Sequence, residues 1–166
     1  MQVFYAGAMT TFPRVTIETD FGPMVVELWT DVAPRHAENF LKLTDSGFYD
    51  NLSFHRILKN FVIQGGCPRG DGTGDPGWKV KAEFNKKEHD KGVLSMARSA
   101  HPDSAGSQFF VCLGREHCRH LDGQYTAFGK VVEGLDVVDK LAAVPADSSS
   151  GRPQKAPKMT KVARVT

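Results

Sequence analysis

The chain has little of what marks membrane, secreted or nucleic-acid-binding proteins. Its 166 residues include only three cysteines and no Cys-x-x-Cys pair, which argues against a disulfide framework. A net charge of +2 gives no strong case for nucleic acid or an anionic membrane as a partner. No apolar run approaches the roughly 20 residues that span a bilayer. We therefore expect a cytoplasmic protein with reduced thiols.

The composition is that of one ordinary globular domain. The hydrophobic fraction is 40% and the charged fraction 24%, and the length is sufficient for a real core. Residues 1–13 lack the basic start and apolar stretch of a signal peptide, so we interpret them as an N-terminal extension. Residues 14–166 then form a single domain.

Hydrophobic periodicity predicts many short strands and two helices. Alternation favours strands at 14–19, 24–28, 92–97 and 161–165, with a weaker one at 79–84, and the last strand could pair with the first. Helical spacing is present between Pro34 and Gly47 and again over 133–141. About seven or eight strands with two helices imply an antiparallel barrel.

The segment 54–66 contains the most informative pattern. It predicts a tight hairpin turning at 59–60, with Arg56 opposite Gln64 and both on one face with Val62. An arginine on an apolar floor is costly unless it has a target, although an edge arginine could also reach water along its stem.

Two further segments carry the same kind of information. In 104–111, a turn leads into a strand that places Gln108 and Phe110 on one face and Phe109 and Val111 on the other. In 120–129, a turn-rich loop runs into another strand. Together with the hairpin, these ordered motifs resemble the cyclophilin family of peptidyl-prolyl cis–trans isomerases, from about residue 15 to 165.

The resemblance implies a mainly β fold, a closed eight-stranded antiparallel β-barrel capped by a helix at each end. The barrel of this family is packed solid, so the substrate groove lies outside it. The implied function is rotation about X–Pro bonds in protein substrates, assisting folding. Expected partners are proline-containing peptides and unfolded or flexible protein segments. No cofactor and no metal are expected, and the protein is expected to be a monomer.

Site residues also follow from the resemblance. Arg56 is the implied donor to the prolyl nitrogen, and Gln64 and Phe61 complete the catalytic set. The implied substrate-binding residues are Val62, Arg98, Ser99, Gln108, Phe110, His120, Leu121 and Tyr125. The backbone at 98–99 is expected to pair with the peptide as an added strand.

Some positions depart from the family pattern. His120 stands where many members have a tryptophan that donates a hydrogen bond to cyclosporin, so we predict weaker cyclosporin binding with activity largely kept. Tyr125 replaces a frequent histidine, Val62 a methionine and Arg98 an asparagine. The segment 99–102 is one residue longer than the commonest form, which leaves the geometry of that loop open.

The main alternative is a proline-peptide binding module without catalysis, because binding and catalysis would use the same slot. A Ser-His-Asp hydrolase could be assembled from Ser107, His55 and Asp103, but it lacks a nucleophile elbow. His55 is more simply a histidine of the core or one that supports the site.

Two ligand-binding alternatives carry less weight. His117, Cys118 and His120 are potential metal ligands, but their adjacent spacing suits one ion poorly. The glycine-rich segment 70–77 could cradle a phosphate, yet neither a Lys-Ser/Thr pair nor a helix follows it. By resemblance this segment is a loop that flanks the substrate groove.

Overall fold

The structure is a computed structural model that describes residues 11–166. The first ten residues of the predicted N-terminal extension lie outside the described residues. The described end of the extension contacts the domain. The Pro13 carbonyl accepts a hydrogen bond from the Leu28 backbone N–H at 2.9 Å, and Phe12 packs against an apolar cluster that contains Trp29.

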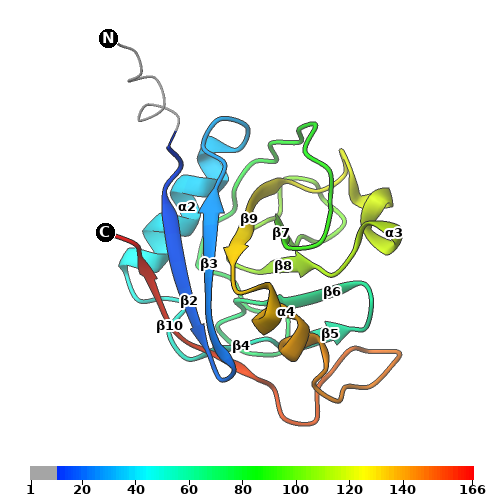
Figure 1. Ribbon diagram of the computed structural model, residues 1–166. Coiled ribbons are helices and arrows are strands. Elements are labelled where there is room, and N and C mark those ends of the chain that lie inside the picture. Colours follow the sequence, from blue (N-terminus) through cyan, green and yellow to red (C-terminus); the bar gives the residue numbers. More distant parts are fainter. Residues whose placement is uncertain (1–10) are drawn as a thin grey trace.

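One curled antiparallel sheet organises the chain (Figure 1). Its strands are β2 (Arg14–Thr19), β3 (Gly22–Leu28), β4 (Leu52–Ser53), β5 (Arg56–Leu58), β6 (Val62–Gly65), β7 (Val93–Met96), β8 (Phe109–Cys112), β9 (Ala127–Glu133) and β10 (Lys158–Arg164). Their order is β4-β10-β2-β3-β9-β7-β8-β6-β5. The two edge strands, β4 and β5, are joined in the chain through Phe54 and His55 alone. Such a link reaches at most about 11 Å, so the sheet has to curl into a half-barrel.

The predicted strand and helix counts need correction. The described residues form nine strands and three α-helices, where the resemblance implied eight strands and two helices. Helices α2 (Pro34–Asp45) and α4 (Leu135–Ala142) are the predicted ones, whereas α3 (Arg115–Cys118) is too short to leave a periodic pattern. The closed barrel is not confirmed, because the ladder of residues 11–166 ends at β4 and β5 without pairing between them.

The prediction of a strand at 79–84 is wrong. Within this segment Val80 makes only an isolated bridge. The Glu83 carboxylate instead accepts hydrogen bonds from the backbone N–H groups of Arg35 at 3.2 Å and His36 at 2.9 Å, at the start of α2. The N-cap residue of α2 offers no side-chain acceptor of its own, so the segment caps the helix rather than extending the sheet.

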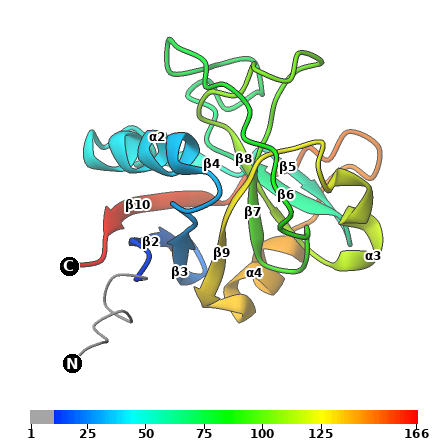
Figure 2. The same cartoon turned by 90° about the horizontal axis from the view of Figure 1, so that it is seen from above.

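The predicted pairing of the chain ends is confirmed. β2 pairs with β3 as a hairpin and with β10 on its other side, with Val162 opposite Ile17. Alternate residues of β2, Val15 and Ile17, are fully buried, as a half-buried strand requires. Figure 2 shows α2 beside β10 and α4 beside β9. Both helices bury side chains in the same core, on the inner face of the curled sheet.

The main core is aromatic at its centre. The ring of Phe40 from α2 lies 4.9 Å from Tyr49, 5.4 Å from Phe109 and 5.5 Å from Phe128, measured between centroids. The Tyr49 hydroxyl donates to the carbonyl of Ser107 at 2.8 Å, and burial raises the pKa of Tyr49 above its usual value. The interior is therefore filled by side chains, and any ligand has to bind outside it.

A second apolar cluster lies on the other face of β8. Its buried members are Trp29, Val62, Val93, Phe110, Cys112, Cys118, Leu121 and Ala127. Phe61 and Tyr125 pack against it while staying partly exposed.

Among the described residues, no helix combines the length and the apolar character needed to cross a bilayer.

Three buried histidines predict acid sensitivity. Burial is the main cause that lowers the pKa of His36, His55 and His89 below the usual value. The unfolded chain therefore binds more protons near pH 6 than the fold does, and stability falls as the pH drops below the unfolded histidine pKa of about 6.5.

Urea unfolding at pH 7.5 and pH 5.5 would measure this effect. We expect a lower midpoint at pH 5.5, a smaller loss in His55→Phe, and an unchanged loss in the control His117→Gln, whose histidine is exposed. An equal loss in all three proteins would contradict the assignment to buried histidines.

Candidate active site

The predicted hairpin forms with the predicted register. β5 pairs with β6 so that Arg56 lies opposite Gln64 and Ile57 opposite Ile63. The turn residue Asn60 takes a φ of 66°, the left-handed conformation that a tight hairpin needs. Ile57 and Ile63 are buried in the main core. Their neighbours in the two strands, Arg56, Val62 and Gln64, therefore lie on the outer face.

A chain of hydrogen bonds holds the Arg56 side chain. Its Nη1 donates to Gln64 Oε1 at 3.2 Å, and Gln64 Nε2 donates to Gln108 Oε1 at 3.1 Å. Gln108 Nε2 in turn donates to the carbonyls of Gly72 and Gly74, each at 3.0 Å. The guanidinium is thus oriented by amides that are anchored on the glycine-rich loop, so Arg56 is not simply an edge arginine reaching water.

The outer face of the hairpin borders a pocket of about 280 Å³. Its lining residues are Arg56, Phe61, Val62, Gln64, Ala97, Arg98, Phe110, His120, Leu121 and Tyr125. All but Ala97 were predicted from the sequence. Two predicted residues, Ser99 and Gln108, line an adjoining hollow of about 260 Å³. This hollow shares Gln64, Ala97 and Arg98 with the pocket.

Aromatic contacts shape the apolar part of the pocket. The rings of Phe61 and His120 are stacked, with centroids 5.8 Å apart and planes inclined by 25°. Phe110 meets Tyr125 edge to face at 5.8 Å, and it is only 5% exposed. Because these rings pack on the second cluster, the pocket is apolar on one side and carries the guanidinium of Arg56 on the other.

A buried polar network that the sequence analysis missed supports Phe110. The His89 ring stacks on Phe110 at 6.3 Å and is held from both sides, by Ser95 Oγ at 2.8 Å and by Asp122 Oδ1 at 3.0 Å. Arg115 binds Asp122 at 2.6 Å and keeps the pKa of that carboxyl well below its usual range. His89 lies in an irregular segment with no periodic pattern, so nothing in the sequence pointed to this role.

The loop at 98–99 uses more of its backbone hydrogen-bonding groups internally than we expected. The Arg98 guanidinium lies 4.5 Å from the Tyr125 ring centroid and donates to the Gln124 carbonyl at 2.7 Å. The Ser99 N–H donates to Ser104 Oγ at 2.8 Å, and the Ser99 carbonyl accepts from Arg98. The backbone of Ser99 is therefore already engaged within the loop.

The alternative metal and hydrolase sites are not assembled. Cys118 is buried with its Sγ 3.2 Å from the Phe61 carbonyl, whereas His117 is exposed. Residues 11–166 contain no group of three or more His, Cys, Asp or Glu side chains placed to hold a metal.

The three residues of the hydrolase alternative are engaged elsewhere. The Ser107 hydroxyl donates to the Gly66 carbonyl at 2.7 Å, and Asp103 accepts from the Ala82 N–H at 2.8 Å. Buried His55 has no hydrogen-bond partner on Nδ1 among the described residues, and burial lowers its pKa. This fits the simpler prediction that His55 is a packed histidine.

Comparisons with known proteins agree with this geometry. Residues 14–164 match the family described as "Cyclophilin type peptidyl-prolyl cis-trans isomerase/CLD". The chain is 44% identical to a peptidyl-prolyl cis–trans isomerase of Arabidopsis thaliana over 142 residues, which cover 82% of this chain and 85% of that protein. It is 46% identical to an isomerase of Helicobacter pylori over 130 residues, or 76% of this chain and 78% of the relative.

Solved structures show the same fold. A cyclophilin-type isomerase of Cryptosporidium parvum superposes with a TM-score of 0.87 at 33% identity, covering 93% of this chain and 98% of that one. The same protein in the presence of the dipeptide Ala-Pro gives a TM-score of 0.85 over 92% and 99% of the two chains. The chain therefore belongs to the cyclophilin family and is a peptidyl-prolyl cis–trans isomerase.

Proposed function

We propose that Arg56 catalyses rotation about X–Pro bonds when the proline ring is bound in the pocket next to the Arg56 side chain. The observation that carries this assignment is a guanidinium held by Gln64 at the border of a pocket of about 280 Å³ that is apolar on its opposite side. A pocket of that size suits a single ring. Phe61, Phe110 and Leu121 would grip the ring, in keeping with the Ala-Pro dipeptide present with the Cryptosporidium relative.

The reaction needs no nucleophile and no general base. Rotation about a peptide bond meets a barrier of roughly 18–20 kcal/mol, because the C–N bond is partly double. At the twisted transition state this conjugation is lost, and the prolyl nitrogen becomes pyramidal and able to accept a hydrogen bond. A donor that reaches the nitrogen only in that state lowers the barrier by differential binding.

Arginine suits this task better than lysine. A guanidinium carries its charge throughout the physiological pH range and presents its N–H groups in a fixed plane. Here one N–H is used to fix the group on Gln64, which leaves others to point at the substrate. Charge-assisted donation in a partly dry pocket is stronger than the same contact in water.

The peptide would run over the pocket beside the 97–99 loop. Since Ser99 uses its backbone groups internally, strand-like pairing with the substrate falls on the backbone of Arg98. Such pairing recognises the main chain and not the side chains. We therefore expect proline-containing peptides and flexible protein segments of varied sequence as substrates.

Replacement of the donor is the first test. For Arg56→Ala we expect kcat/KM on an Ala-Pro peptide to fall by about 100- to 1000-fold, the loss seen when a transition-state donor is removed. Peptide affinity should change by less than about threefold, because the ring pocket remains. NMR exchange spectroscopy measures the rate and the affinity on one sample.

The control is Arg14→Ala, an exposed arginine at the start of β2, which should leave both quantities unchanged. Equal losses of rate and affinity in Arg56→Ala would make Arg56 a binding residue. Absence of catalysis in the unmodified protein, with peptide binding intact, would favour the non-catalytic binding module.

Gln64 should act as a positioning residue. In Gln64→Leu the guanidinium loses its anchor, so we expect kcat to fall about tenfold with KM nearly unchanged. In Gln64→Glu the carboxylate pulls the guanidinium away from the substrate, and kcat should fall further. A rise in KM with kcat unchanged would show that Gln64 contacts the substrate instead.

His120 should limit cyclosporin binding. Its ring is exposed and stacked on Phe61 at the pocket. Replacement by tryptophan adds contact area and an indole donor, so His120→Trp should tighten cyclosporin inhibition by about tenfold while activity changes little. His117→Trp, on the exposed side of α3, is the matched control. No gain over that control would contradict the assignment.

A further inference from the structure

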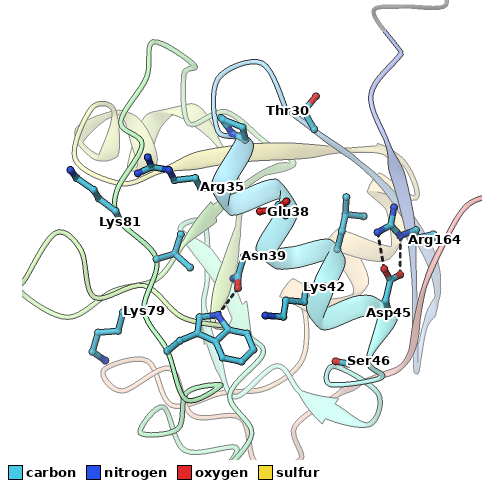
Figure 3. A pocket seen from close by; sticks show the side chains of 14 residues that line it. Thr30, Arg35, Glu38, Asn39, Lys42, Asp45, Ser46, Lys79, Lys81 and Arg164 are labelled. Atoms are coloured by element: carbon cyan, nitrogen blue, oxygen red, sulfur yellow. Dashed lines mark hydrogen bonds and ion pairs between the residues drawn. The ribbon is translucent and has the colours of Figure 1, made fainter.

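A further hollow, separate from the isomerase pocket, lies between α2 and the segment 78–81 (Figure 3). It has a volume of about 1260 Å³ and is open to solvent along its length. None of its lining residues lines the proline pocket. Lys79 lines both this hollow and the one of about 260 Å³ that adjoins the isomerase pocket. Figure 3 shows Arg35, Asn39, Lys42 and Asp45 along α2, with Lys79 and Lys81 on the opposite wall. We call this hollow the α2 groove.

An exposed but rigidly held tryptophan lines the α2 groove. Trp78 is 39% exposed, whereas the other tryptophan, Trp29, is 5% exposed. The Trp78 indole N–H donates to Asn39 Oδ1 at 2.7 Å, and Asn39 Nδ2 donates to the Gly106 carbonyl at 2.8 Å. Lys42 Nζ lies 4.5 Å from the ring centroid. The ring is thus fixed in place with apolar area left uncovered, as in the anchor residues of binding surfaces.

The α2 groove is basic. Its lining includes five basic side chains against two acidic ones, Glu38 and Asp45, while the whole chain carries a net charge of only +2. Asp45 is already occupied by Arg164, through two hydrogen bonds of 2.8 and 2.7 Å. Among residues 11–166, no carboxylate pairs with the side chains of Arg35 or Lys81. These charges are available to an outside ligand.

The walls of the α2 groove are preformed. Glu83 ties the segment after Lys81 to the first turn of α2 through its hydrogen bonds to Arg35 and His36. Val80 is bonded to the Ala105 carbonyl at 2.8 Å, which fixes the middle of the segment. Binding of a ligand would therefore order few additional groups of the protein and cost little conformational entropy.

We propose that the α2 groove docks an acidic protein segment that carries one large apolar side chain. The apolar residue would pack on Trp78, and flanking carboxylates would pair with Arg35, Lys42 and Lys81. A nucleic acid fits less well, because Glu38 lies among the cations and few unmatched charges remain to meet consecutive phosphates. The groove is open and, at about 1260 Å³, exceeds the roughly 300–1,000 Å³ of enclosed small-molecule pockets, which favours a peptide.

The probe is a short fluorescein-labelled peptide of aspartate and glutamate with one central leucine and no proline, measured by fluorescence polarisation at low ionic strength. The unmodified protein should bind it saturably. Lys42→Glu/Lys81→Glu should weaken binding by at least about tenfold. The control Lys140→Glu/Lys155→Glu makes the same change of charge at exposed positions outside the groove. Lys140, like Lys42, lies in the last turn of its helix. This control should change the affinity for the peptide by less than about twofold.

Tryptophan emission locates the peptide independently. In a Trp29→Phe background all tryptophan emission comes from Trp78, and covering its ring should shift that emission to shorter wavelength. A peptide with serine in place of the leucine should bind more weakly and give no shift. Turnover of an Ala-Pro peptide should be the same in both double variants, so failure of docking remains separate from failure of the isomerase.

Three results with the peptides would overturn the proposal: no saturable binding, equal weakening in both double variants, or equal binding of the serine peptide. Tighter binding of a single-stranded oligonucleotide, lost in Lys42→Glu/Lys81→Glu alone, would identify the α2 groove as a nucleic-acid surface and also overturn it.

Discussion

The strict alternation of side chains along β8 is the constraint on which the structure depends. Phe109 and Val111 enter the main core, while Phe110 and Cys112 enter the second cluster on the opposite face. Four consecutive buried residues therefore join the packing of the core to the floor of the candidate active site. A one-residue slip of β8 would exchange the two sets and remove Phe110 from the pocket.

The neighbouring strands extend this division. β6 pairs with β8 so that Gln64 lies opposite Phe110, which brings the amide that orients Arg56 next to the ring that borders the pocket. Beneath that ring, His89 is fixed by Ser95 and Asp122. Buried hydrogen bonds thus fix the position of an apolar surface, as the proposed mechanism by pocket shape and one fixed donor requires.

Sequence reasoning succeeded where local geometry determines the outcome. The register of Arg56 with Gln64 follows from a tight turn and a period of two, and the pairing of β10 with β2 follows from matching strand patterns. It failed where contacts between residues far apart in the chain determine the local structure. Glu83 caps α2 across 48 residues, and this tertiary bond overrides the weak alternation of 79–84. Similarly, α3 and the His89 network have no periodic pattern, because they are set by contacts with the second cluster.

The short edges of the sheet limit strand pairing with other polypeptide chains. Extended polypeptide segments pair readily with an open strand edge. Here the two edges are β4 and β5, of only two and three residues, and the chain turns directly from one into the other. The Ile57 N–H in the middle of β5 already donates to the Gly151 carbonyl at 2.7 Å. Little of either edge is therefore left to serve as a template for an added strand.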